Sequence, residues 1–202
     1  MIAAALVPVA CGVAASIGMR IGAALCHGVV GFADGPDPVR VPAWAYVAAG
    51  VGCGFPIAAH GWPVASVGFA CIVIAALAVC CACDLQRGFL PDWCTLGLCA
   101  MALGLAVVRH DATALIGTLA IGLPFAALAM STAGRGMGWG DVKLAAAGGA
   151  LLGFGASIGA FLVAAVAAYA IARRMRRANR PIPFGAYLAT AIAVTFSLVA
   201  PG

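Results

Sequence analysis

The carboxylates of this chain are few and belong to one residue type. Its 202 residues contain six acidic side chains, all of them aspartates, so any carboxylate chemistry must come from these six. Two of them, Asp84 and Asp141, lie at the ends of apolar segments, within CACDLQRGFLPD and GMGWGDVKL. An ionisable group at the edge of a membrane-length apolar segment is costly unless it faces protein or water. We therefore treat both aspartates as candidates for function.

Two neighbouring aspartates could perform acid–base chemistry without a metal ion. Carboxylates a few ångströms apart cannot both ionise easily, so they share a proton and titrate as a unit. Such a pair can take a proton from a water and donate one to a peptide carbonyl, which is the chemistry of an aspartic protease. The glycines Gly136, Gly138 and Gly140 would let a substrate strand lie close to the main chain beside Asp141.

A purely structural role explains one aspartate better than the other. Asp141 could be favoured at a helix N-terminus, where its carboxylate meets free backbone N–H groups and the positive end of the helix dipole. Asp84 lies at the C-terminal end of its predicted helix, where the dipole disfavours a negative charge. Another part of the protein must therefore stabilise Asp84.

The elements that must position these residues are membrane helices. Apolar residues make up 65% of the chain, charged residues only 8%, and the mean hydropathy is +1.12, whereas soluble domains carry about 25% charged residues. This composition predicts an all-α, polytopic bundle in one integral-membrane domain over residues 1–202. Polar and Gly/Pro-rich breaks predict about eight spans, at 2–26, 41–59, 64–83, 93–108, 112–130, 142–153, 156–172 and 184–199. The stretch 142–172 could instead be one long tilted helix.

The basic residues predict the orientation of these spans. The formal net charge is +5, and five arginines are concentrated in one loop: Arg173, Arg174, Arg176, Arg177 and Arg180. In a membrane protein such a cluster indicates a cytoplasmic loop, so we expect anionic lipid rather than nucleic acid as its partner. With eight spans, Asp84 and Asp141 both lie at this face.

Three motifs resemble a known family. DLQRGFLPD at 84–92, GMGWGDVKLAAAGG at 136–149 and PIPFGAYLA at 181–189 occur in this order. Together they resemble the prepilin peptidase (type IV leader peptidase) family of intramembrane GxGD aspartic proteases, over a peptidase-like core of about 76–202. The resemblance implies that Asp84 and Asp141 are the catalytic pair. It also implies cleavage of the basic leader of type IV prepilins or type II secretion pseudopilins, at the cytoplasmic face of the bacterial inner membrane.

The same resemblance nominates supporting residues and limits the cofactors. Gly138, Gly140, Lys143, Phe184 and Gly185 fall on the matching motifs, as substrate-binding or supporting residues. Larger family members carry a cytoplasmic insertion with two C-x-x-C pairs, whereas residues 27–40 contain no cysteine. We therefore expect no metal and no cofactor for peptidase activity. S-adenosylmethionine is expected only if this short form retains the N-methyltransferase activity of the larger enzymes.

Several alternatives stay open at this point. Lys143 either biases the dyad or anchors the substrate main chain, or it is an ordinary lysine at the membrane interface. Asp92 is predicted to cap the fourth span. The protein could also be an inert scaffold of a pilus or secretion assembly. A proton-coupled transporter would instead place its carboxylates near the bilayer midplane.

Overall fold

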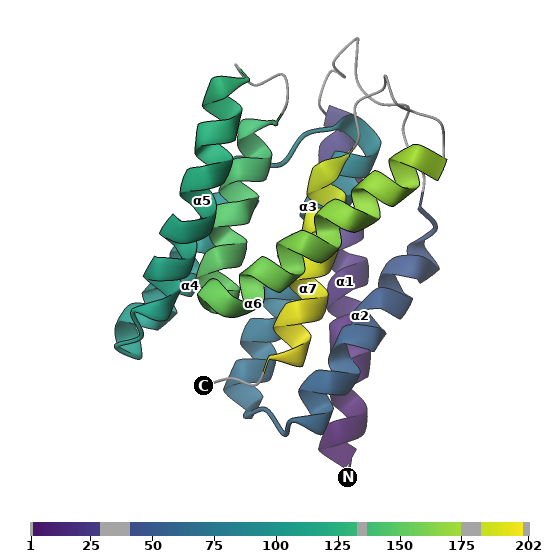
Figure 1. Ribbon diagram of the computed structural model, residues 1–202. Coiled ribbons are helices and arrows are strands. Elements are labelled where there is room, and N and C mark those ends of the chain that lie inside the picture. The colour runs from purple at the N-terminus through teal and green to yellow at the C-terminus, as the bar shows by residue number, and fades with distance from the viewer. Residues whose placement is uncertain (1, 29–40, 133–136, 175–182, 200–202) are drawn as a thin grey trace.

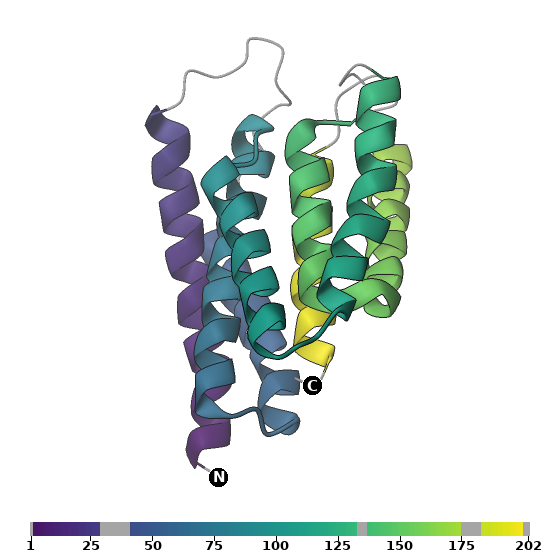
Figure 2. The same cartoon turned by 90° about the vertical axis from the view of Figure 1, so that its left-hand side faces the viewer.

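The computed structural model describes residues 2–28, 41–132, 137–174 and 183–199. Over these ranges it contains helices and no strand, in a single bundle (Figure 1). The helices are α1 (Ile2–Gly28), α2 (Ala43–Ala59), α3 (Val64–Arg87), α4 (Asp92–Val108), α5 (Thr113–Ser131), α6 (Trp139–Arg174) and α7 (Phe184–Leu198). The predicted all-α membrane bundle is confirmed. Figure 2 shows α1 along one side of this bundle and α5 with α6 along the other.

Proline and glycine set many of the helix ends. A proline directly precedes four of the helices, where its missing N–H costs no hydrogen bond and its fixed φ favours a start. These residues are Pro42, Pro63, Pro91 and Pro183. Gly88 ends α3 in the left-handed conformation, with φ of 68°, and its N–H donates to the carbonyl of Asp84 at 2.9 Å. This left-handed C-cap is a common helix end because glycine adopts positive φ without strain.

Helix α6 is folded back on itself at Gly153. This glycine has φ of 69° and ψ of 177°, which no α-helix contains. A Cβ added at Gly148 would lie 3.2 Å from the ring of Phe161, although thirteen residues of straight helix would separate the two by about 20 Å. The two halves of α6 therefore pack against each other, as the sharp bend in Figure 1 shows. The break predicted between 153 and 156 is confirmed.

The number of membrane crossings stays a prediction. Among the described residues, α1, α3, α5 and α6 are long and apolar enough to cross a membrane, whereas α2, α4 and α7 are apolar but shorter. Counting the two halves of α6 separately gives eight apolar segments, close to the eight predicted ranges. Length and composition make the chain a multi-pass membrane protein.

Close helix packing holds α6, which carries Asp141, against α5. Gly117 and Gly149 face each other, and a Cβ on either one would overlap the backbone of the other. Small residues at such crossings let two helices approach closely where lipid removes the usual hydrophobic driving force. The end of α3, both ends of α6 and the start of α7 then lie at one end of the bundle (Figure 1).

Candidate active site

Asp84 is stabilised by the N-terminus of α7. Its side chain lies in the last turn of α3 and the residue is only 5% exposed. The backbone N–H of Ala186 donates to Asp84 Oδ2 at 2.8 Å, and the N–H of Gly185 also interacts with this carboxylate. Both N–H groups belong to the first turn of α7, where no carbonyl of the same helix can accept them.

Asp84 thus takes the role of an N-cap for a helix in a distant part of the chain. An N-cap side chain normally accepts from the second and third N–H groups of its own helix. Pro183 stands at the N-cap of α7 and makes no side-chain cap hydrogen bond, so the carboxylate from α3 replaces it. The positive end of the α7 dipole offsets the unfavourable position of Asp84 at the C-terminal end of α3.

Asp141 lies in the first turn of α6, partly buried. Its backbone N–H donates to the carbonyl of Gly138 at 3.1 Å, and the N–H of Gly138 interacts with its carboxylate. Asp141 Oδ1 is buried and has no hydrogen-bond partner among the described residues. One oxygen of this carboxylate therefore remains available to a ligand or to a second acidic group.

Gly185 lies against both carboxylates. A Cβ built on it would lie 2.9 Å from Asp141 Oδ1 and 3.2 Å from Asp84 Cγ. These two atoms are therefore at most about 6 Å apart, close enough for two carboxyl groups to influence each other's ionisation. The sequence predicted all three residues as members of the site, and the structure brings them together from α3, α6 and α7.

Leu90 covers this group of residues, although the sequence analysis did not single it out within the motif at 84–92. It lies in the connection between α3 and α4, and its side chain is only partly exposed. The Cβ position of Gly140 is 3.0 Å from Leu90 Cβ, and the Cβ position of Gly185 is 2.7 Å from Leu90 Cδ1. Leu90 thus occupies the space that both glycines leave by lacking a side chain, directly beside Asp141.

Lys143 pairs with Asp92. Its Nζ donates to Asp92 Oδ1 at 2.7 Å, with the two side chains 31% and 64% exposed. The prediction that Asp92 caps α4 is wrong, because Pro91 is the N-cap residue and no side-chain cap hydrogen bond is formed. The carboxylate instead ties the start of α4 to the first turns of α6. Lys143 is two positions after Asp141, which places their side chains on different sides of the helix.

Phe184 packs into the bundle. Its ring centroid lies 6.5 Å from that of Phe125 in α5, which in turn lies 5.4 Å from that of Phe161 in the second half of α6. Phe184 therefore fixes the start of α7, and with it Gly185 and Ala186, against α5 and α6. A direct contact of Phe184 with substrate stays a prediction.

The opposite end of the bundle carries a different aspartate. Asp111 is fully exposed and accepts from the N–H of Thr113 at 2.8 Å. Hydrogen bonds from the Thr113 side chain and backbone lower the pKa of Asp111. Asp111 provides a control for Asp84 and Asp141, because it is an exposed aspartate with no carboxylate partner among the residues that the structure describes.

A family model matches residues 71–173 of the chain, about half of its length, and describes the type IV leader peptidase family. The chain belongs to the type IV leader peptidase family. The match includes Asp84, Asp141 and Lys143. It ends before Gly185, whose position beside the two carboxylates comes from the geometry of α7.

Individual relatives carry names of the same kind. A prepilin leader peptidase/N-methyltransferase of Burkholderia pseudomallei is 37% identical over 139 residues, which are 63% of this chain and 45% of the relative. A prepilin leader peptidase/N-methyltransferase of Aeromonas hydrophila is 38% identical over 124 residues, which are 54% of this chain and 41% of the relative. The alignments thus cover less than half the length of these curated relatives. No solved structure matches the chain.

Proposed function

We propose that this leader peptidase family member is an intramembrane aspartic endopeptidase whose catalytic pair is Asp84 and Asp141. The observation that carries the proposal is that both carboxyl groups lie within about 3 Å of the Cβ position of Gly185. Asp84 and Asp141 are 57 positions apart in the sequence and belong to different helices, α3 and α6. Asp84 has backbone donors, whereas Asp141 Oδ1 has no donor among the described residues.

The pair would act as one unit with a shared proton. The ionised carboxyl takes a proton from a water, whose oxygen bonds to the scissile carbonyl carbon, while the protonated carboxyl donates to the carbonyl oxygen. When the resulting diol collapses, the carbon–nitrogen bond breaks, the newly protonated carboxyl gives its proton to the amine nitrogen, and the other carboxylate takes a proton from a diol hydroxyl. The α7 N-terminus stabilises Asp84 whenever it is the ionised member of the pair, and Leu90 limits the access of bulk water to the pair.

We propose prepilins or pseudopilins as substrates, with cleavage of their basic leader at the cytoplasmic face of the bacterial inner membrane. The names of the two relatives support the substrate class. The orientation rests on positive charge, since Arg173 and Arg174 end α6 at the same end of the bundle as the candidate pair. Anionic lipid at this face would attract a basic leader.

The position of the two carboxylates favours a peptidase over a proton-coupled transporter. Asp84 lies in the last turn of α3 and Asp141 in the first turn of α6. A transporter would hold its carboxylates near the middle of its helices, whereas a peptidase that cuts a leader outside the membrane needs them at a helix end.

Cleavage in membranes tests the proposal. The chain is expressed with a prepilin or pseudopilin from the same genome, and the mass of the substrate is measured before and after incubation. We expect wild-type membranes and the Asp111→Asn variant to shorten the substrate at its N-terminus, and Asp141→Asn to leave it whole. A substrate cut equally well by Asp141→Asn membranes, or by membranes without the protein, would contradict the proposal.

A further inference from the structure

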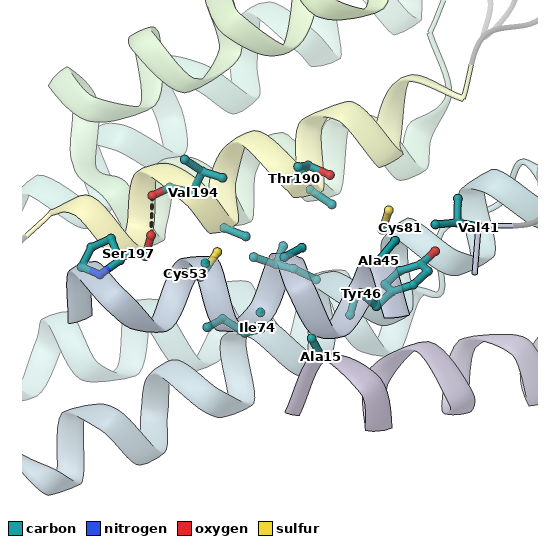
Figure 3. Close-up of a pocket in the computed structure, with 18 of the residues that line it drawn as sticks. Ala15, Val41, Ala45, Tyr46, Cys53, Ile74, Cys81, Thr190, Val194 and Ser197 are labelled. Atoms are coloured by element: carbon teal, nitrogen blue, oxygen red, sulfur yellow. Dashed lines mark hydrogen bonds between the residues drawn. The ribbon is translucent and has the colours of Figure 1, made fainter. Parts of the chain in front are cut away.

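A cavity of about 520 Å³ lies between α2, α3 and α7 (Figure 3), and neither Asp84 nor Asp141 lines it. Its walls are mostly small apolar residues, with Ala15 of α1 at its base. The figure shows Tyr46 and Cys81 toward one end and Ser197 toward the other. Helix α1 packs closely on both α2 and α3, whereas α2 makes few contacts with α3 and α7, so this cavity separates α2 from the two helices that carry Asp84 and Ala186.

The cavity is long and narrow. Its lining runs from Ala45 to Pro56 on α2 and from Ile74 to Leu85 on α3, and eleven helical steps correspond to about 16 Å. The volume then gives a mean cross-section of about 30 Å², whereas an α-helix at least 10 Å wide needs about 80 Å². An extended chain fits inside this space, whereas a helix could only lie along its open side, where Ala49, Thr190 and Val194 are exposed.

The polar groups of the lining have little to offer an extended peptide. The hydroxyl of Thr190 already donates to the carbonyl of Ala186 at 2.8 Å, and that of Ser197 donates to the carbonyl of Val194 at 2.7 Å. A peptide strand brings one N–H and one C=O per residue, and burying these groups without partners costs several kcal/mol each in an apolar medium. A hydrocarbon chain carries no such groups.

We propose that this cavity binds a single acyl chain of a membrane lipid. At about 30 Å³ per methylene, close to the volume of one water in the liquid, the cavity holds roughly 17 carbons. The bound chain fills the space between α2 and the pair α3 and α7. The lining includes Leu85, next to Asp84, and Ala189, one turn after Ala186. The bound acyl chain therefore supports the spacing of the helices that form the candidate site. This binding of a lipid chain does not depend on the proposed peptidase activity.

Lipid counting on the intact protein tests this site. Ala49 lines the cavity, whereas its neighbour Ala48 is also exposed but does not line it. The variants Ala49→Trp and Ala48→Trp therefore form a matched pair. Protein purified in mild detergent is delipidated, palmitoyl-oleoyl phosphatidylglycerol or palmitate is added back, and native mass spectrometry counts the bound molecules. We expect one saturable copy of either probe on the wild type and on Ala48→Trp, and at least tenfold weaker binding to Ala49→Trp.

Other results would overturn the proposal. Equal binding to all three proteins, or no saturable copy on the wild type, would show that the cavity holds no discrete chain. Binding of phosphatidylglycerol without palmitate would assign recognition to the headgroup, and release of the lipid by one equivalent of substrate would assign the cavity to the substrate. Should Ala49→Trp fail to fold, Val194→Trp on the opposite wall decides the question, because this side chain is 46% exposed and lines the same space.

Discussion

A single methyl group at residue 185 should separate the two carboxylates. In Gly185→Ala the new Cβ would lie 2.7 Å from Leu90 Cδ1, 2.9 Å from Asp141 Oδ1 and 3.2 Å from Asp84 Cγ. The leucine tip can rotate away, but both carboxyl groups must shift by several tenths of an ångström. Misplacing reacting groups by about 1 Å can cost about 100-fold in rate, so we expect a 10- to 100-fold loss of kcat, about 1.4 to 2.7 kcal/mol in the barrier.

The fold should tolerate the same substitution. Gly185 is helical with no positive φ, and alanine is favoured over glycine in a helix by up to about 1 kcal/mol. This gain offsets part of the overpacking cost of about 1–3 kcal/mol. We expect a change in melting temperature of only a few degrees, together with a nearly unchanged KM.

Steady-state cleavage of a prepilin by the purified variant measures both constants. Gly97→Ala in α4 is the matched control, because nothing lies within 4 Å of its Cβ position and its activity should stay at the wild-type level. Adding Leu90→Ala to Gly185→Ala removes the leucine contact while leaving the two carboxyl contacts, so activity should remain low. Full activity of Gly185→Ala would refute the described arrangement, and full rescue by Leu90→Ala would assign the loss to leucine alone.

Three further outcomes are expected. We expect Lys143→Met and Asp92→Asn each to lower activity only a few-fold, since a partly exposed ion pair contributes at most about 1 kcal/mol. The double exchange Asp92→Lys with Lys143→Asp should restore wild-type activity, and failure of this rescue would indicate that Lys143 acts on the two catalytic aspartates instead. In a cysteine-free background, Asp111→Cys should react with an impermeant thiol reagent outside intact cells and Arg174→Cys only after permeabilisation; the reverse pattern would invert the topology. Activity should resist a chelator, and loss restored by zinc would contradict a metal-free mechanism.

Hydropathy and Pro/Gly punctuation were sufficient to predict the helices. The ends of the predicted ranges fall within a few residues of the observed helix ends or of the bend in α6. The break after Gly153 was placed correctly because glycines interrupt the apolar run there. These signals are local, so one stretch of sequence contains them. The same pattern cannot decide how many segments cross the membrane, because α2, α4 and α7 are short for a span.

The candidate site was only partly predictable from sequence. The charge of Asp84 at a helix C-terminus showed that a stabilising partner was needed, but the partner, the N–H of Ala186, lies 102 residues away. Leu90 and the ion pair of Lys143 with Asp92 depend in the same way on how helices pack. Gly140 was predicted to leave room for a substrate strand and Gly185 was nominated by the family motif, but neither could show that Leu90 would fill the space beside them.

The most direct test of a shared catalytic unit compares single and double removal of the carboxyl groups. Purified Asp84→Asn, Asp141→Asn and the double variant are assayed for prepilin cleavage, with folding checked by thermal unfolding. Residues that act as one unit have grossly non-additive effects, and general acid–base catalysis contributes about 10²- to 10⁴-fold. We predict that each single variant loses at least about 100-fold and that the double variant is no worse than a few-fold below either. A folded single variant near wild-type activity, or losses that multiply in the double variant, would contradict the catalytic pair.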